Sequence, residues 1–122
     1  MAEEQVSIRE ILLPLRTVSE SNARDHWRTR ARRAKEQRAI ARSMSRMALA
    51  GGVESVTKGE IRLTRIGPRA LDGDNLQGAL KAIRDGVADA LKIDDGDPRL
   101  SWVYAQERGD YGVRVEVELY GA

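Results

Sequence analysis

The chain of 122 residues contains no cysteine and no phenylalanine, and histidine occurs once, at position 26. Without cysteine the chain can form no disulfide framework, no thiolate nucleophile and no cysteine-ligated zinc or iron–sulfur site. His26 by itself cannot anchor a zinc ion, and no nearby residue marks a nucleophile for a Ser–His–Asp arrangement. We therefore expect His26 to serve the structure or to contact a phosphate rather than to act in acid–base catalysis.

Long hydrophobic runs are also missing, since no apolar stretch approaches the roughly 20 residues that a membrane-spanning helix needs. The acidic start Met1-Ala2-Glu3-Glu4 differs from the positively charged start of a signal peptide. These absences predict a cytoplasmic protein that does not associate with a membrane. The 41% of residues that are hydrophobic include few aromatics, so they predict a single domain over residues 1–122 with a mostly aliphatic core.

The pattern of apolar residues predicts the element order β-α-β-α-β-β. The predicted strands are residues 6–13, 59–66, 100–106 and 113–120, and the predicted helices run from about residue 24 or 30 to 49 and from 75 to 92. Apolar residues from Leu76 to Leu91 recur at helical spacing and make the second helix the clearest element. Gly109-Asp110-Tyr111-Gly112 predicts a β-hairpin between the last two strands. The predicted fold class is α+β, with a small mixed sheet packed against two helices.

Asp72-Gly73-Asp74-Asn75 lies between a predicted strand and a predicted helix. If residues 72–74 are extended, both carboxylates face the same side of the chain. Two hard oxygen ligands beside a helix N-terminus suit Mg²⁺ together with a phosphate. The alternative is that Asp74 is only the helix N-cap, completed as a capping box by Gln77, while Asp72 is a turn residue. The residues by themselves leave both interpretations open.

A second acidic group, Asp94, Asp95 and Asp97, follows the same helix in a segment whose composition is typical of a turn. The predicted helix is about 26 Å long, so these acids reach the first two only if the chain turns back along a neighbouring strand. Residues 72–97 together carry seven acidic and three basic side chains, a net charge of −4.

Residues 24–46 show the opposite balance, with nine basic and two acidic side chains and a net charge of +7. Several of the basic positions lie three, four or seven residues apart and therefore form one stripe along the predicted helix. This stripe can neutralise a row of phosphates, which makes its members and the neighbouring Arg24 candidate nucleic-acid ligands. An ordinary solvated charged face is the alternative. The basic stripe consists of Arg28, Arg32, Lys35, Arg42 and Arg46.

Asp72-Gly73-Asp74-Asn75-Leu76-Gln77, followed after the predicted helix by Ile93-Asp94-Asp95, resembles the pattern of the RusA family of Holliday-junction resolvases. In that family, found in bacteria and their phages, Asp-x-Asp-Asn-Leu opens a helix and Asp-Asp lies beyond it. Ser21-Asn22 is similar to the family's asparagine-bearing loop. The resemblance implies a RusA-like fold and an endodeoxyribonuclease of DNA recombination and repair that uses Mg²⁺, with Mn²⁺ as a substitute. It also implies a homodimer that nicks branched DNA, the four-way junction, symmetrically.

By the same resemblance, the metal ligands are Asp72, Asp74 and Asp95, with Asp94 as the alternate for the third. Carboxylates brought together in this way repel one another until a cation arrives, so we expect their pKa values to be raised. Bound Mg²⁺ can activate water, neutralise charge at the phosphorus and stabilise the leaving oxygen, so the reaction needs no histidine.

The chain departs from the family at Gly78, where the family has a functional lysine four residues after the second aspartate. Lys81 is the expected substitute if its side chain leans back toward the helix start. The alternative for Lys81 is an i, i+4 ion pair with Asp85. Two other functions also stay open. One is a non-catalytic DNA-binding module of the same fold, and the other is an RNA-binding or assembly protein whose aspartate motif is only a helix cap.

Overall fold

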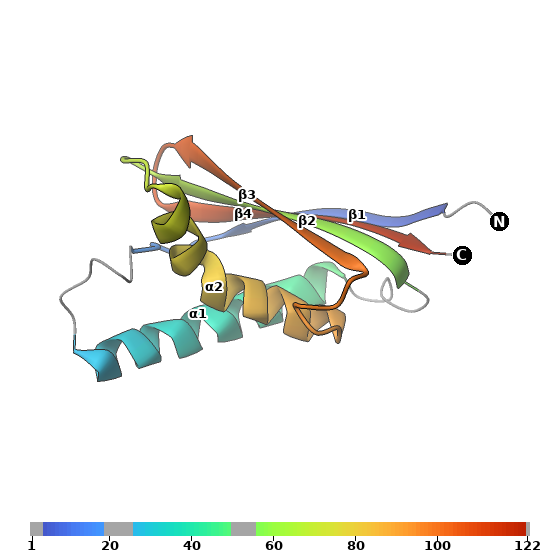
Figure 1. Ribbon diagram of the computed structural model, residues 1–122, viewed down its shortest axis with the longest axis horizontal. Helices are drawn as coiled ribbons and strands as arrows, with labels where there is room; N and C mark the ends of the chain where they lie inside the picture. The colour runs from blue at the N-terminus through green and yellow to red at the C-terminus, as the bar shows by residue number, and fades with distance from the viewer. Residues whose placement is uncertain (1–3, 19–25, 50–55, 122) are drawn as a thin grey trace.

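The computed structural model describes residues 4–18, 26–49 and 56–121, in which four strands and two helices follow one another (Figure 1). In chain order they are β1 (Glu4–Leu13), α1 (Trp27–Ala48), β2 (Val56–Gly67), α2 (Gly73–Leu91), β3 (Leu100–Arg108) and β4 (Gly112–Gly121). This order confirms the predicted α+β fold class and its β-α-β-α-β-β sequence.

The strands form one mixed sheet in the order β1-β4-β2-β3. β4 is antiparallel to β1 and to β2, whereas β3 is parallel to β2 because α2 carries the chain back to the end where β2 begins. The predicted β-hairpin at residues 109–112 is wrong, since β2 lies between β3 and β4. The α2 crossover places β3 on one edge of β2, and β4 fills the other edge. The Gly109 amide donates to the Gly67 carbonyl at 3.1 Å and ties the connection to the end of β2.

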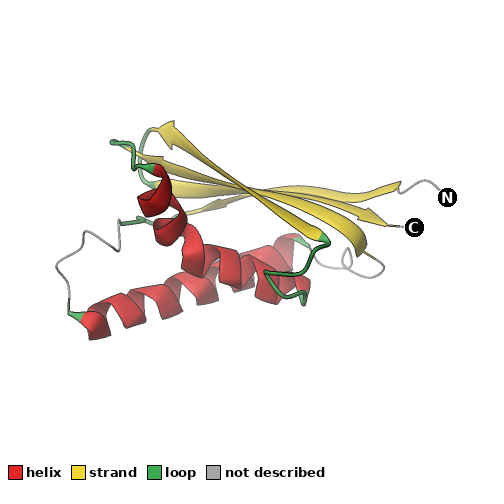
Figure 2. Cartoon of the chain, viewed as in Figure 1, coloured by secondary structure: helices red, strands yellow, loops and turns green. Residues whose placement is uncertain are grey.

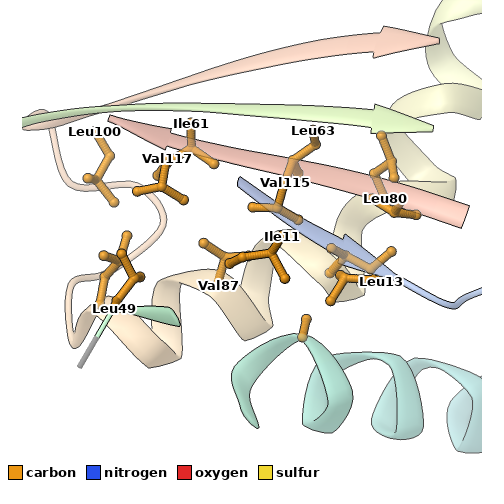
Figure 3. Packing of buried hydrophobic residues seen from close by; sticks show 14 of the residues in the cluster. Ile11, Leu13, Leu49, Ile61, Leu63, Leu80, Val87, Leu100, Val115 and Val117 are labelled. Carbon is orange, nitrogen blue, oxygen red and sulfur yellow. The ribbon is translucent and has the colours of Figure 1, made fainter. Parts of the chain in front are cut away.

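Both helices lie on the same face of the sheet (Figure 2). Alternate residues of a strand point to opposite faces, and this alternation directs aliphatic residues of β1, β2 and β4 toward the helices. α2 covers them with its predicted apolar stripe, which confirms an aliphatic core (Figure 3). No helix within the described ranges has the length and apolar character needed to cross a bilayer. The most deeply buried side chains include Leu13, Ile61, Leu63, Leu80, Ile83, Val87, Val115 and Val117.

α1 packs against α2 through small side chains and backbone. The buried residues of α1 are Gln37, Ala41 and Ser45. Gly86 of α2 faces this helix, and a β-carbon built on it would overlap the Arg38 carbonyl oxygen and lie 2.7 Å from Ala41 Cβ. Because the Arg38 carbonyl is backbone, it cannot move aside as the end of a side chain can. The helices therefore approach so closely that glycine is required at their crossing.

Gly86→Ala should lower the free energy of unfolding by about 1–3 kcal/mol, because α1 must move away from α2 to admit the methyl group. Gly78→Ala is the matched control in the same helix, at a position where a β-carbon meets nothing within 4 Å. That exchange should raise the free energy of unfolding by about 0.5–1 kcal/mol through helix propensity. Urea denaturation followed by far-UV circular dichroism measures both variants. Equal effects of the two exchanges would contradict the close helix crossing.

Candidate functional site

The aspartate motif lies at the N-terminus of α2, but its residues have different roles from those predicted. The helix begins at Gly73, and Asp72 is its N-cap: the Asp72 backbone is extended (φ −72°, ψ 168°), and its Oδ1 accepts from the Asn75 amide at 3.3 Å. Asp74 belongs to the first helical turn. The expectations that Asp74 caps the helix and that residues 72–74 are extended are therefore wrong. Both carboxylates are nevertheless exposed at the positive end of the helix dipole.

The segment that precedes α2 is attached to the end of β3. The Leu71 amide donates to Gln106 Oε1 at 2.8 Å, and Gln106 Nε2 donates to the Leu71 carbonyl at 2.5 Å. These two bonds hold the acidic pair, defined as Asp72 and Asp74, beside the C-terminal part of β3.

Asp95 lies between α2 and β3, where Arg84 of α2 contacts it. The Arg84 guanidinium donates from Nε to Asp95 Oδ2 at 3.1 Å, from Nη2 to the Asp95 carbonyl at 3.0 Å and from Nη1 to Tyr104 Oη at 2.8 Å. It also lies 4.7 Å from the centre of the Trp102 ring, whose Nε1 donates to the same Asp95 carbonyl at 2.9 Å. These four residues, the Arg84 cluster, join α2, β3 and the segment between them.

No pattern in the sequence singles out Arg84, Trp102 or Tyr104 as members of a site. On α2, Arg84 is one of several charged residues opposite the apolar stripe, and its spacing does not distinguish it from the others. Its hydrogen-bond partners lie 11 and 20 residues away along the chain. Only the return of the chain along α2 and into β3 brings them together, so no local signal could have identified the cluster.

Asp95 does not meet the acidic pair within one chain. The Asp95 carbonyl contacts Trp102, whereas the acidic pair is held beside Gln106, and four residues of a strand span about 13 Å. A Mg²⁺ ion binds its ligands at about 2.0–2.1 Å, so ligands of one ion must lie much closer together than Trp102 and Gln106 do. Within the three described ranges, no group of three or more His, Cys, Asp or Glu side chains is placed to hold a metal ion. The acidic pair alone fits a Mg²⁺ ion that keeps several waters and binds a substrate phosphate.

Lys81 contacts two carboxylates from the middle of α2. Its Nζ is 2.7 Å from Asp85 Oδ1, which confirms the i, i+4 ion pair, and 3.5 Å from Asp95 Oδ2. The hydrogen bond with Asp85 raises the pKa of Lys81. At Asp95, desolvation raises the pKa, but the positive charges of Lys81 and Arg84 together hold it below its ordinary value. The predicted increase is wrong for Asp95, because cations surround this carboxylate.

A groove with a volume of about 630 Å³ lies between α1 and the C-terminal part of α2. It divides the basic stripe, because Arg42 and Arg46 line it while Arg28, Arg32 and Lys35 are exposed along the N-terminal half of α1. The predicted stripe thus presents two positively charged surfaces. The charged residues that line the groove are Arg38, Arg42, Arg46, Asp85, Asp89, Lys92, Asp94 and Asp95.

His26 is the N-cap of α1. Its Nδ1 accepts a hydrogen bond from the Arg28 amide at 3.2 Å, and its ring centre lies 5.5 Å from that of Trp27. The structural role expected for this histidine is therefore confirmed. Arg24 and the Ser21-Asn22 pair lie outside the described residues.

Lys92 ends α2 in an unusual conformation at the rim of the groove. It is the C-cap, with a left-handed backbone (φ 57°, ψ 34°), and its amide donates to the carbonyls of Ala88 and Asp89. Glycine is the usual residue in this position, because the left-handed conformation costs other residues roughly 1–2 kcal/mol. Among the described residues, Lys92 alone combines a side chain with a positive φ. The positive charge at the helix C-terminus offsets part of this cost.

Arg38 links the two helices beside the groove. Its Nε and Nη2 donate to the two carboxylate oxygens of Asp89 at 2.7 and 2.9 Å, and its Nη1 lies 4.0 Å from Asp85 Oδ2. The hydrogen bond from Arg38 holds the pKa of Asp89 below its ordinary value, against a smaller opposing effect of desolvation. The Arg38 side chain is 50% exposed, so solvent screens the pair.

This pair predicts a loss of stability in acid. Because the pKa of Asp89 is depressed in the folded state, its stabilising contribution is complete above the unfolded-state pKa of about 4. It is lost as the pH falls through the lower folded-state value. Arg38→Gln should therefore lower the free energy of unfolding at neutral pH by about 0.2–1 kcal/mol, and the deficit should shrink toward zero in acid. Urea denaturation of the wild type and the variant across this pH range tests the prediction. A difference in the free energy of unfolding that stays constant into acid would contradict it.

Comparison with known proteins adds one relative and one distant structure. No family model matches the chain. A protein of Xylella fastidiosa (strain Temecula1 / ATCC 700964), named as an uncharacterized protein, is 40% identical over 81 residues, which are 61% of this chain and 51% of that protein. Thiamine-monophosphate kinase from Stenotrophomonas maltophilia K279a has a TM-score of 0.48 and 12% identity, covering 97% of this chain and 31% of the kinase chain. The chain thus spans only part of either protein, and the likeness to the kinase supports no inference about activity.

Proposed function

We propose that the protein is a Mg²⁺-dependent endodeoxyribonuclease of the RusA type that cuts four-way DNA junctions as a homodimer in the cytoplasm. The observation that carries the proposal is the acidic pair, because Asp72 and Asp74 are both exposed at the N-terminus of α2. A helix N-terminus attracts a phosphate, and two carboxylates beside it suit a hard cation. The same pair opens the motif that resembles the RusA family.

In this proposal the acidic pair holds the metal and the basic stripe holds the DNA backbone. Bound Mg²⁺ supplies an activated water and neutralises charge at the phosphorus. The hydrogen bond from the Asn75 amide to Asp72 keeps that carboxylate at the helix start. Since no third His, Cys, Asp or Glu side chain among the described residues is placed to complete the site, the remaining ligands would be waters and the substrate phosphate. Asp94 or Asp95 would join the site only from a second copy of the chain.

A second candidate function is a non-catalytic DNA-binding module. The observation that favours it is the arrangement of the cations on α2: Gly78 replaces the family's lysine, and Lys81 is paired with Asp85 and Asp95. Both candidates use the same positively charged surfaces, so DNA binding is common to them. Only cleavage in the presence of a metal ion distinguishes the nuclease from the module.

Purified protein should nick a synthetic four-way junction symmetrically with Mg²⁺ or Mn²⁺ and should not do so with a chelator. Asp72→Asn should reduce cleavage by about a hundredfold or more, since it weakens the metal site, while asparagine still caps the helix. Metal ions should raise the melting temperature of the wild type and leave that of Asp72→Asn unchanged. Glu36→Gln, which removes an exposed carboxylate from α1, is the control and should cleave normally. Metal-independent cleavage would refute the proposal.

Gly78→Lys should increase the cleavage rate by about tenfold or more, because it places a cation one helical turn after Asp74. A β-carbon at this position meets nothing within 4 Å. Gly78→Ala controls for the gain in helix propensity and should leave the rate unchanged. Lys81→Ala tests the alternative cation in the same assay. Lost cleavage with retained junction binding would assign the role to Lys81, whereas an unchanged rate would remove Lys81 from the site.

A further inference from the structure

The groove between α1 and α2 keeps a positive charge after its internal ion pairs are formed. Six cationic and four carboxylate side chains either line the groove or form ion pairs with residues that line it. The pairs are Arg38 with Asp85 and Asp89, Lys81 with Asp85 and Asp95, and Arg84 with Asp95. Arg42, Arg46 and Lys92 remain, and within the described part of the chain no ion pair joins them to a carboxylate. Asp94 and, through its charge, Asp89 oppose these three cations, but the six cations still outnumber the four carboxylates, so the groove has a surplus of positive charge.

The three remaining cations come from both walls of the groove. Arg42 and Arg46 are one turn apart on α1, a rise of about 6 Å, which is comparable to the separation of adjacent phosphates on one nucleic-acid strand. Lys92 lies at the end of α2 and lines the same groove. Asp94 Oδ1 accepts from the Gly96 amide at 3.1 Å, which directs this carboxylate toward its own loop. A chain of phosphates in the groove would therefore contact cations on two sides.

The backbone of Lys92 is an independent observation that points to a ligand. A glycine at this C-cap would avoid the strain of the left-handed conformation, yet the chain has a lysine there and directs it to the groove. Strain retained in the native state is typical of positions with a functional side chain. The structure therefore supplies one reason for a lysine at this position, which is its positive charge.

We propose that this groove binds the sugar-phosphate backbone of a nucleic-acid strand, with Arg42, Arg46 and Lys92 as its phosphate ligands. The inference rests on the proposed function and extends it, because it places DNA contacts at the C-terminal end of α2, away from the acidic pair. Arg38, Lys81 and Arg84 neutralise the carboxylates of the groove and so prevent them from repelling the strand. Lys92 is not a member of the basic stripe, so the stripe did not predict it as a phosphate ligand.

The test measures how salt weakens binding of a labelled four-way junction, by fluorescence anisotropy without divalent metal so that no cleavage occurs. Each phosphate contact contributes about 0.9 to the slope of log K against log salt concentration. The triple variant Arg42→Gln/Arg46→Gln/Lys92→Asn should therefore reduce the slope by about 2 to 3. Lys58→Asn is the matched control, because Lys58 is exposed on β2. The next residue, Gly59, faces the core residues Leu100 and Leu119, so Lys58 lies on the opposite side of β2. Its slope should equal that of the wild type.

The single variants at Lys92 separate ligand binding from a structural role. Lys92→Asn keeps a residue that tolerates the left-handed conformation, so it should weaken junction binding without lowering the melting temperature. Lys92→Arg should restore binding. A wild-type slope in the triple variant would overturn the groove while leaving the proposed function intact. Failure of the wild type to bind the junction at all would overturn the proposed function, and the groove with it.

Discussion

The close approach of α1 and α2 at Gly86 positions the wall of the groove that carries Arg38, Arg42 and Arg46. The buried residues of α1 are Gln37, Ala41 and Ser45, which offer little apolar area, so hydrophobic burial by itself holds this helix weakly. Ala41, Met44 and Ala48 pack in or against the core, and two further interactions hold the helix: the close approach at Gly86 and the bidentate ion pair between Arg38 and Asp89. Because both interactions lie beside the groove, they set its width. A displacement of α1 would separate the cations on the two walls of the groove.

Arg84 has a corresponding effect on the segment between α2 and β3. It holds the Asp95 backbone and carboxylate and contacts two aromatic residues of β3. The segment is therefore attached both to α2 and to β3. The same contacts change the chemistry of Asp95. A metal ion bound there would compete with Lys81 and Arg84 for the carboxylate, whereas Asp72 and Asp74 are exposed to solvent. Charge and distance therefore both favour the acidic pair as the metal ligands in the proposed reaction.

The net charge of +2 conceals this division of charge along α2. The acidic pair lies at the positive N-terminal end of the helix dipole, and the surplus of cations lies beside its negative C-terminal end, so each helix end favours the charges that lie there. α2 has 19 residues, which corresponds to about 28 Å between the two regions. In the proposed function, a DNA substrate that contacts both regions would therefore extend along this helix.

The sequence predicts the six elements, their order and the aliphatic core, because hydrophobic periodicity and turn residues act within a few positions of each other. It also determined which charged residues exist in each segment, including the motif at Asp72. Contacts within the folded chain place β2 between β3 and β4, make Asp72 rather than Asp74 the cap of α2, and bring Asp95 to Arg84 rather than to the acidic pair. Strand order and ion pairing depend on contacts between residues far apart in the chain. Local patterns cannot specify those contacts, because each charged residue has several partners of similar energy until the fold selects among them.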